Sequence, residues 1–178
     1  MIVWRKTQVG IPAANPAERK RFILRTKTIV VLPYQESWPQ AFFKITAELR
    51  EAVGNRVLRF EHVGSTSVPG LAAKPIIDID AVIADSHLLN PLILRLANAG
   101  YIHEGNLGIA GREAFRYTDK PHLLQHHLYV CPKDSPELKR HLAFREYLRA
   151  HPDAVAAYSR VKMEAARLYP TDIDAYCL

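Results

Sequence analysis

Residues 62–80 read HVGSTSVPGLAAKPIIDID, and this stretch decides the fold of the chain. It starts at the end of the segment VLRFEHV over 57–63, crosses a loop rich in Gly, Ser and Pro over 64–74, and enters a β-branched run over 75–84. Runs of this kind, bounded by turn residues, are typical of strands. The stretch therefore predicts two strands joined by a loop that contains glycine and serine.

The second of these strands carries two acids on one side. Successive side chains of a strand point to opposite faces, so Ile77 and Ile79 would face a core, while Asp78 and Asp80 would share the other face, about 6.6 Å apart. Two neighbouring carboxylates repel each other, and a divalent cation removes that conflict. Mg²⁺ prefers one or two carboxylates together with substrate phosphates. We therefore predict this acidic pair as the ligands of a Mg²⁺ ion.

Side chains near the acidic pair are candidates for holding those phosphates. The loop before the strand supplies backbone and hydroxyl donors, and a later glycine-rich segment supplies planar guanidinium groups. The predicted phosphate-binding residues are Gly64, Ser65, Ser67, Lys74, Arg112 and Arg116. Two alternatives stay open, because the cations can instead form salt bridges with the acids and the serines can serve only as turn hydroxyls. The loop matches neither a P-loop nor a Gly-x-Ser-x-Gly nucleophile elbow.

Histidines gather near a further predicted strand over 124–131. His126 and His127 would point to opposite faces, and His127 lies about 13 Å along the strand from Cys131, too far to share one metal ion. This spacing argues against a zinc site. Either a histidine of this pair, for which we take His127, faces the carboxylates as a ligand, proton carrier or hydrogen-bond partner, or it is a satisfied histidine of the core or a hairpin.

The rest of the chain alternates between strand and helix signals. Helices are predicted from Ser37, with Gln40 completing a capping box, and from Ser135, with proline in the next position. The predicted strands span 28–32, 57–63, 75–84, 101–103, 114–117 and 124–131, and the predicted helices span 37–53, 88–99, 136–150 and 152–169, with a short last helix after 171. Helices and strands mixed in this way predict an α+β (α/β-like) fold.

Charge is distributed unevenly along the 178 residues. The chain has 24 basic and 18 acidic side chains and a net charge of +6, which would suit a polyanionic partner. Residues 1–27 hold seven of the basic groups and one acid, so residues 28–178 carry no net charge. We therefore predict a basic N-terminal extension over 1–27, a single domain over 28–178, and no nucleic acid as the partner of that domain.

Composition places the chain among globular proteins. It is 48% hydrophobic and 24% charged, and no apolar run approaches the roughly 18 residues of a membrane span. No secretory signal is present, and two cysteines are too few for a disulfide framework. We expect a cytoplasmic protein without a membrane partner.

Several segments together resemble the GrpB family. They are VLPYQESW (31–38), HVGSTSVPGLAAKPIIDID (62–80), GNLGIAGREAF (105–115), HHLYVC (126–131) and ELKRHLAFREYLRA (137–150). The resemblance covers roughly residues 29–176, and the 62–80 segment is long and specific.

The resemblance implies a nucleotidyltransferase-like fold of the polymerase-β type, with a small mixed β-sheet flanked by helices. Gly64-Ser65 would be the Gly-Ser element of that superfamily, and Asp78 and Asp80 its Asp-x-Asp element. The superfamily usually adds a third carboxylate on a nearby strand. The strand over 124–131 has no acid, which leaves Glu104 and Glu113 as loop candidates and places two-metal catalysis in doubt.

The family resemblance also implies a longer C-terminus. Chains of the family usually continue past Tyr176 into a further helix, whereas this chain ends at Leu178. We expect a truncated last helix, exposed apolar surface and self-association.

Two functions follow from these observations. The first is a Mg²⁺-dependent nucleotidyltransferase that acts on a small-molecule acceptor, with Asp78, Asp80 and His127 at the reaction. The alternative is a non-catalytic module that binds a nucleotide or the phosphates of CoA, or a partner protein of dephospho-CoA kinase, to which some relatives are fused.

Overall fold

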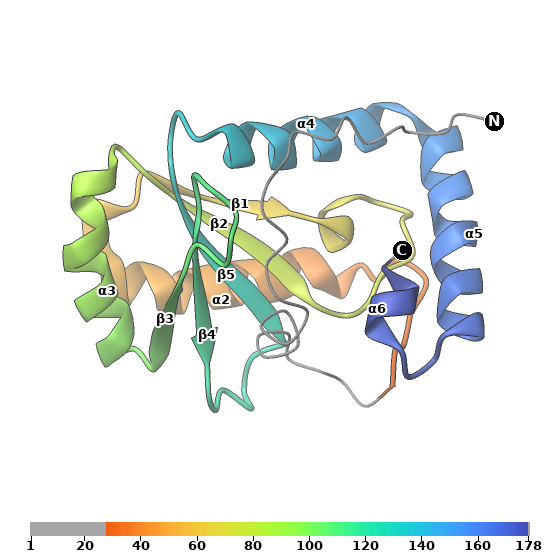
Figure 1. Ribbon diagram of the computed structural model, residues 1–178, viewed down its shortest axis with the longest axis horizontal. Helices are drawn as coiled ribbons and strands as arrows, with labels where there is room; N and C mark the ends of the chain where they lie inside the picture. Colours follow the sequence, from red (N-terminus) through yellow and green to blue (C-terminus); the bar gives the residue numbers. More distant parts are fainter. Residues whose placement is uncertain (1–27, 178) are drawn as a thin grey trace.

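A single five-stranded sheet organises the molecule (Figure 1), and the computed structural model describes residues 28–177. The strands are β1 (Arg59–Val63), β2 (Ile77–Ile83), β3 (Tyr101–Gly105), β4 (Glu113–Tyr117) and β5 (His126–Pro132). They lie in the order β1-β2-β5-β4-β3. Only β2 and β5 run parallel, and the other neighbouring pairs are antiparallel. The sheet is therefore mixed and the fold α+β, which confirms the predicted fold class.

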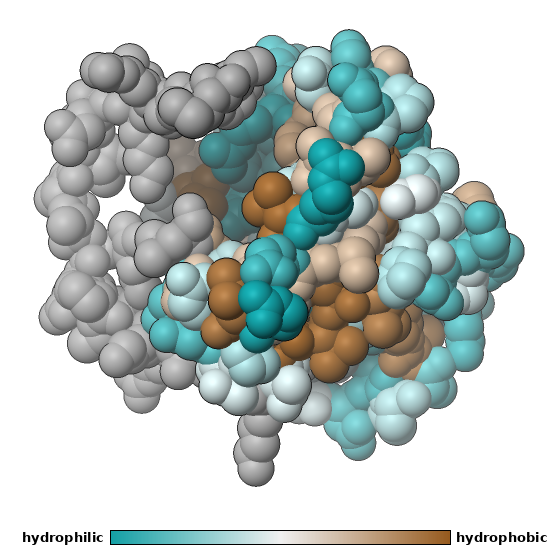
Figure 2. Space-filling view, turned by 90° about the vertical axis from the view of Figure 1, so that its right-hand side faces the viewer, coloured by the Kyte–Doolittle hydropathy of each residue, from teal (hydrophilic) through white to brown (hydrophobic). Residues whose placement is uncertain are grey.

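Helices flank this sheet and extend beyond it. They are α2 (Ser37–Val53), α3 (Leu89–Asn98), α4 (Pro136–Ala150), α5 (Pro152–Leu168) and α6 (Ile173–Tyr176), with 3-10 turns η1 (Gly54–Arg56), η2 (Ser65–Ser67) and η3 (Ser86–Leu88). Figure 1 shows α4 running along one side of the sheet and turning sharply into α5. Figure 2, which views the molecule from the side where α5 lies in Figure 1, shows hydrophobic and hydrophilic residues mixed over this face.

The main core lies between the sheet and helices α2 and α3. Ile77 and Ile79 of β2 are fully buried there against Ile45 and Leu49 of α2 and Leu92 of α3. The apolar side of β2 was predicted from its alternating pattern, and burial of such side chains is the main force that holds the helices to the sheet. The opposite side of β2 is thereby left for its acidic residues.

The two ends of α2 differ in how well they follow their sequence signals. Gly54 ends the helix with a φ of +62°, as its lack of a side chain allows. At the start, Glu36 occupies the cap position, and no side-chain cap is made. The capping box predicted for Ser37 and Gln40 is therefore absent, although the helix begins where it was expected.

Helix α4 covers only part of the second face of the sheet. Leu138 packs there on Val82 of β2 and Cys131 of β5 in a small separate core. Leu148 at its end joins Val155 of α5 and the loop after η2 in a further cluster. Because α4 sits over β2 and β5, the acids of β2 lie beneath the helix at the edge of an open region.

The first described segment departs from its prediction. Instead of a strand over 28–32, the structure has one isolated bridge, between Leu32 and Ala73. The backbone N–H of Ile29 instead donates to the carbonyl of Pro170 near the C-terminus, so the segment crosses the molecule without a ladder partner. The predicted extension over 1–27 lies outside the described residues. Within 28–177, no helix is long and apolar enough to cross a membrane.

Candidate functional site

The acidic pair of β2 occupies two different environments. Asp78 and Asp80 share the face of β2 opposite the core, as their spacing predicted. The side chain of Asp78 is 29% exposed, whereas Asp80 has no exposed surface. Burial raises the pKa of Asp80, and the nearby charge of Asp78 acts in the same direction. Only Asp78 is therefore open to a ligand from solution.

A glycine turn presses directly against Asp78. Gly64 has a φ of +68°, and a Cβ added to it would lie 2.2 Å from Oδ2 of Asp78. Ser67 closes the turn by donating its hydroxyl to the Gly64 carbonyl at 2.6 Å. Only glycine fits both the backbone angle and the contact. The predicted Gly-Ser element and the first aspartate are thus adjacent.

A buried lysine that the sequence did not reveal supports the turn. Lys162 of α5 is 9% exposed, and its Nζ donates to Oγ of Ser65 at 2.7 Å. No carboxylate within 28–177 forms an ion pair with it. Burial lowers the pKa of Lys162 to about 8, although Asp78 opposes the shift. The turn therefore holds an ammonium group whose charge lacks a paired anion.

An arginine also fixes the turn from α4. The guanidinium of Arg149 donates from Nη2 to the carbonyl of Ser67 at 2.8 Å. Ser67 itself is buried, so its hydroxyl and its carbonyl are both used inside the protein. The structure thus gives Ser67 a role in shaping the turn, and its prediction as a phosphate ligand remains untested.

Asp80 forms a hydrogen-bonded chain with α4. Nδ1 of His141 donates to Oδ2 of Asp80 at 2.8 Å, and Nε2 of His141 lies 3.0 Å from Oε1 of Glu137. The hydrogen bond to Asp80 raises the pKa of His141. The other carboxylate oxygen of Asp80, Oδ1, is buried without a hydrogen-bond partner among the described atoms. Oδ2 of Asp80 is therefore bound to His141, whereas Oδ1 has no hydrogen-bond partner within 28–177.

His127 reaches the acids from the neighbouring strand. β5 runs parallel to β2 with His127 beside Asp78, and Nδ1 of His127 lies 2.9 Å from Oδ1 of Asp78. His126, on the opposite face, is buried, and its Nε2 lies 2.8 Å from the Tyr101 hydroxyl. His127 is thus the histidine of the pair that lies beside the carboxylates, and its role as a ligand or proton carrier stays a prediction.

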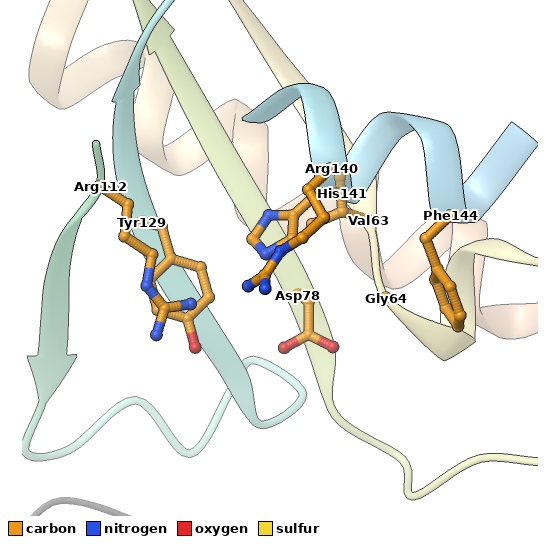
Figure 3. Close-up of a pocket in the computed structure, with 8 residues that line it drawn as sticks. All are labelled: Val63, Gly64, Asp78, Arg112, Tyr129, Arg140, His141 and Phe144. Carbon is orange, nitrogen blue, oxygen red and sulfur yellow. The ribbon is translucent and has the colours of Figure 1, made fainter. Parts of the chain in front are cut away.

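Three of these residues, Gly64, Asp78 and His141, border a cleft of about 360 Å³ (Figure 3), and the others, including Asp80, His127 and Lys162, are not part of its lining. Figure 3 shows Asp78 in the middle, with Arg112 and Tyr129 on one side and Gly64 on the other. The full lining is Val63, Gly64, Asp78, Arg112, Tyr129, Arg140, His141 and Phe144. The cleft thus combines one accessible carboxylate with cationic and aromatic side chains.

Four of the six predicted phosphate ligands, Ser65, Ser67, Lys74 and Arg116, lie outside this lining, and the last two are engaged elsewhere. Nζ of Lys74 is 5.5 Å from the ring centre of Tyr176 on α6. Nε of Arg116 lies 3.3 Å from Oε1 of Glu104 across the β3–β4 pair. Neither side chain borders the cleft.

The acids proposed as third metal ligands are engaged elsewhere. Glu113 contacts Nε2 of His103 at 2.7 Å, and Glu104 contacts Arg116. No cluster of three or more His, Cys, Asp or Glu side chains suited to a metal ion occurs between residues 28 and 177. Asp78, the acid of the pair that reaches the cleft, fits one Mg²⁺ that takes its remaining ligands from water and phosphate, whereas Asp80 is fully buried, so the described residues do not fit a two-metal centre.

Comparison with known proteins places this site in a family. The GrpB family, described as "GrpB protein", matches residues 28–178. The chain is 30% identical over 177 residues to the UPF0157 protein YqkA of Bacillus subtilis, covering 96% of this chain and 51% of that protein. It is 40% identical over 150 residues to the UPF0157 protein PA4798 of Pseudomonas aeruginosa, covering 83% of this chain and 61% of that protein. The chain thus spans about half to three fifths of these relatives.

A relative of different description also matches. The chain is 30% identical over 169 residues to a protein named dephospho-CoA kinase from Mycolicibacterium paratuberculosis, covering 82% of this chain and 42% of that protein. The match concerns less than half of that relative.

Solved structures share the fold. The GrpB protein of Enterococcus faecalis superposes with a TM-score of 0.74 at 35% identity, covering 83% of this chain and 88% of that chain. The Cid1 poly(U) polymerase in its MgGTP-bound form superposes with a TM-score of 0.53 at 8% identity, covering 74% of this chain and 42% of that chain. The latter likeness concerns the fold alone. The chain shares its fold with the Cid1 poly(U) polymerase, and by its family match and its relatives it belongs to the GrpB family.

Proposed function

We propose that the protein binds a nucleoside triphosphate with Mg²⁺ in this cleft and transfers the nucleotidyl group to a small-molecule acceptor. The observation that carries the proposal is the buried ammonium of Lys162, which is bound to Ser65 beside Asp78 and has no carboxylate partner in the described part of the chain. A buried charge is costly unless it is paired, so an anionic ligand is expected at this place. Triphosphate oxygens supply that negative charge.

The turn supplies the other contacts that a phosphate needs. Gly64 brings the backbone close to Asp78, and the hydroxyl of Ser65 is oriented by Lys162. Asp78 would hold the Mg²⁺ ion, and the fully buried Asp80, bonded to His141, would add negative charge near it. When bound, that ion would neutralise phosphate charge and orient the phosphates. The rest of the catalysis would come from positioning and electrostatic stabilisation.

A nucleoside base would find an apolar wall in the cleft. Phe144 lines the cleft and is partly exposed, and its ring makes an edge-to-face contact with Tyr158 at 6.1 Å between centroids. Nζ of Lys162 lies 5.2 Å from the centre of the Tyr158 ring. The aromatic wall therefore adjoins the proposed phosphate site, which favours a nucleotide over a simple phosphate ester.

The transfer step would proceed by direct displacement. A hydroxyl oxygen of the acceptor forms a bond to the α-phosphorus, the bond from that phosphorus to the bridging oxygen breaks, and pyrophosphate leaves. Because Nδ1 of His127 faces Asp78, its Nε2 is the ring atom through which His127 would take the acceptor proton. The assignment of catalytic roles to Asp78, Asp80 and His127 is part of the proposal.

Binding and turnover can be tested separately. Calorimetry with ATP, GTP and CoA, each with and without Mg²⁺, should show Mg²⁺-dependent binding of the triphosphates. The combined change Asp78→Asn and Asp80→Asn, and separately Lys162→Met, should weaken it about tenfold or more. Lys44→Met is the matched control, because Lys44 is an exposed lysine on α2, across the sheet. Wild-type protein that binds none of these nucleotides would contradict the proposal.

A second function keeps the binding and omits the transfer. It is favoured by the engagement of Asp80 with His141 and by the pairing of Glu104 and Glu113 with other residues. In this alternative the protein is a nucleotide or CoA-phosphate module, or assists dephospho-CoA kinase, whose name one group of relatives bears. Pyrophosphate release with a panel of metabolites distinguishes the two, because only the transferase releases it.

A further inference from the structure

A second cationic group lies across the cleft from the glycine turn. Figure 3 shows Arg112 and Gly64 on opposite sides of Asp78. Arg112 directly precedes β4 and is joined by Arg140 of α4 in the cleft lining. Lys162 stands on the other side, where it contacts the residue after Gly64. The cleft therefore has a cationic group on each side of its accessible carboxylate.

Arg112 has unmet hydrogen-bonding capacity. Its side chain is 13% exposed, and its guanidinium lies over the ring of Tyr129 at 4.2 Å from the centroid. Its Nε atom is buried without a hydrogen-bond partner in the described structure. Buried polar atoms are normally satisfied, so the orphaned Nε leaves the guanidinium of Arg112, a residue of the cleft lining, with unused hydrogen-bonding capacity.

The nearest acid does not supply that partner. Oε1 of Glu137 lies 3.9 Å from Nη1 of Arg112, beyond hydrogen-bonding distance. The same oxygen already accepts from Nη2 of Arg140 at 2.5 Å and contacts His141 at 3.0 Å. One carboxylate thus serves two arginines and a histidine, and the Arg140 side chain is still 68% exposed. The two guanidinium groups of this wall of the cleft therefore share Glu137 as their only ion-pair partner among residues 28–177.

We infer that Arg112 and Arg140 bind an anionic group, a carboxylate or a phosphate, of the acceptor molecule, while the nucleotide occupies the side of Gly64 and Lys162. The inference rests on the proposed function and names the class of its acceptor, a small anionic metabolite. Planar guanidinium groups suit both anions, because their paired N–H groups match two oxygens. A single polyanion that contacted both Arg112 and Lys162 would pass close to the Asp78 carboxylate and be repelled by it. Two separate anions, one near Arg112 and one near Lys162, would each contact a cation.

The inference can be tested with inorganic phosphate and succinate as probes. Each is titrated into the protein saturated with Mg²⁺ and a non-hydrolysable ATP analogue, and binding is measured by calorimetry. We expect at least one of the probes to bind in the presence of the nucleotide. Arg112→Gln and Arg140→Gln should each weaken that binding about tenfold and leave the affinity for the nucleotide within about twofold. The stronger probe identifies the acceptor's anion as phosphate or carboxylate.

Three further variants sharpen the test. Arg112→Lys keeps the charge but loses the planar fork, so it should bind the probe more weakly than wild type while folding normally. Arg95→Gln, an exposed change on α3 across the sheet, should have no effect. Lys162→Met should weaken the nucleotide and not the probe.

The outcomes separate this inference from the proposed function. Exclusion of both probes by bound nucleotide, or an equal loss of probe and nucleotide in Arg112→Gln, overturns the acceptor site and leaves nucleotide binding standing. Wild-type protein that binds no nucleotide overturns the proposed function and the acceptor role with it. A probe titration without nucleotide then still decides whether Arg112 and Arg140 form an anion site.

Discussion

Gly64 shows how a single residue couples the turn to the carboxylate. Its φ of +68° disfavours any other residue by about 1–2 kcal/mol, and an added Cβ would also meet the Asp78 carboxylate. We expect Gly64→Ala to lower the free energy of unfolding by about 2–4 kcal/mol and to abolish nucleotide binding. Urea denaturation and calorimetry measure the two effects.

Gly100→Ala is the matched control for that change. Gly100 also has a positive φ, of +84°, but no atom lies within 4 Å of the position where its Cβ would be. It should therefore lose only the backbone contribution, about 1–2 kcal/mol, and keep nucleotide binding. Equal losses of stability in the two variants would mean that the contact with Asp78 is unimportant.

We expect the buried charge of Lys162 to lower the free energy of unfolding and to raise the affinity for a phosphate ligand. Its pKa in the folded protein is about 8, against 10.5 for a free lysine, so the folded state disfavours the charged form. We predict that Lys162→Met raises the free energy of unfolding at pH 7 by about 1–3 kcal/mol while removing phosphate affinity. Urea denaturation of the variant and of Lys44→Met provides the comparison.

The lowered pKa of Lys162 also predicts how the free energy of unfolding changes with pH. Between about pH 8 and pH 10.5 the unfolded chain keeps the Lys162 proton and the folded chain releases it. Wild-type stability should therefore rise with pH in this window relative to Lys162→Met, and the gap between the two proteins should shrink. A gap that stays constant from pH 7 to pH 10 would refute the low pKa.

At the scale of elements, α4 organises the cleft through its first turn. The hydroxyl of Ser135 accepts from the backbone N–H groups of Glu137 and Leu138 and donates to the carbonyl of Gly111 at 2.5 Å. Gly111 adjoins Arg112, so one cap links the helix that carries His141 to the loop that carries the arginine. The cap itself was predictable, because serine precedes proline and glutamate there.

We predict that Ser135→Ala costs about 1–2 kcal/mol of unfolding free energy and loosens residues 105–112. Hydrogen exchange should become faster in that loop than in wild type. Asp172→Ala is the control, since Asp172 caps the short helix α6 and has no contact with the loop. Exchange in the loop that matches wild type in both variants would show that the cap acts on α4 alone.

The sequence predicted the helices and strands better than it predicted the contacts between their side chains. Alternation along β2 placed Ile77 in the core and Asp78 opposite it, because strand geometry fixes the side on which each residue lies. The strand expected over 28–32 failed because β propensity alone does not provide a neighbouring strand. Lys162 follows Ser65 by nearly a hundred residues, so no local pattern could pair them.

Some signals were present in the sequence and unused. Arg140 and His141 follow Glu137 by three and four residues, and Phe144 follows those two by four and three, which places the four on one face of the helix. That spacing identifies a polar face on α4, yet the partner of His141 depends on how α4 docks across β2. The sequence pattern therefore predicts the helices and strands that border the cleft, whereas the contacts between their side chains depend on tertiary packing.

At the scale of the whole molecule, the net charge and the candidate site lie in different parts of the chain. All of the net charge of +6 falls in residues 1–27, and residues 28–178 are balanced. Affinity for a long polyanion grows with the excess of positive charge and is reduced by salt. Affinity for a small ligand in the cleft depends instead on a few side chains at defined positions. The two kinds of binding should therefore be separable by removing the first 27 residues.

We predict that protein lacking residues 1–27 loses any affinity for single-stranded DNA in low salt and keeps its response to Mg²⁺ and ATP. At a hundredfold excess of ligand over Kd, binding adds about 2.7 kcal/mol, which corresponds to a rise in Tm of roughly 5–11 °C for a domain of this size. Fluorescence anisotropy and thermal denaturation measure the two responses. DNA binding that survives the truncation would place a nucleic-acid surface on the folded domain, and a lost thermal shift would make the N-terminal segment part of the nucleotide site.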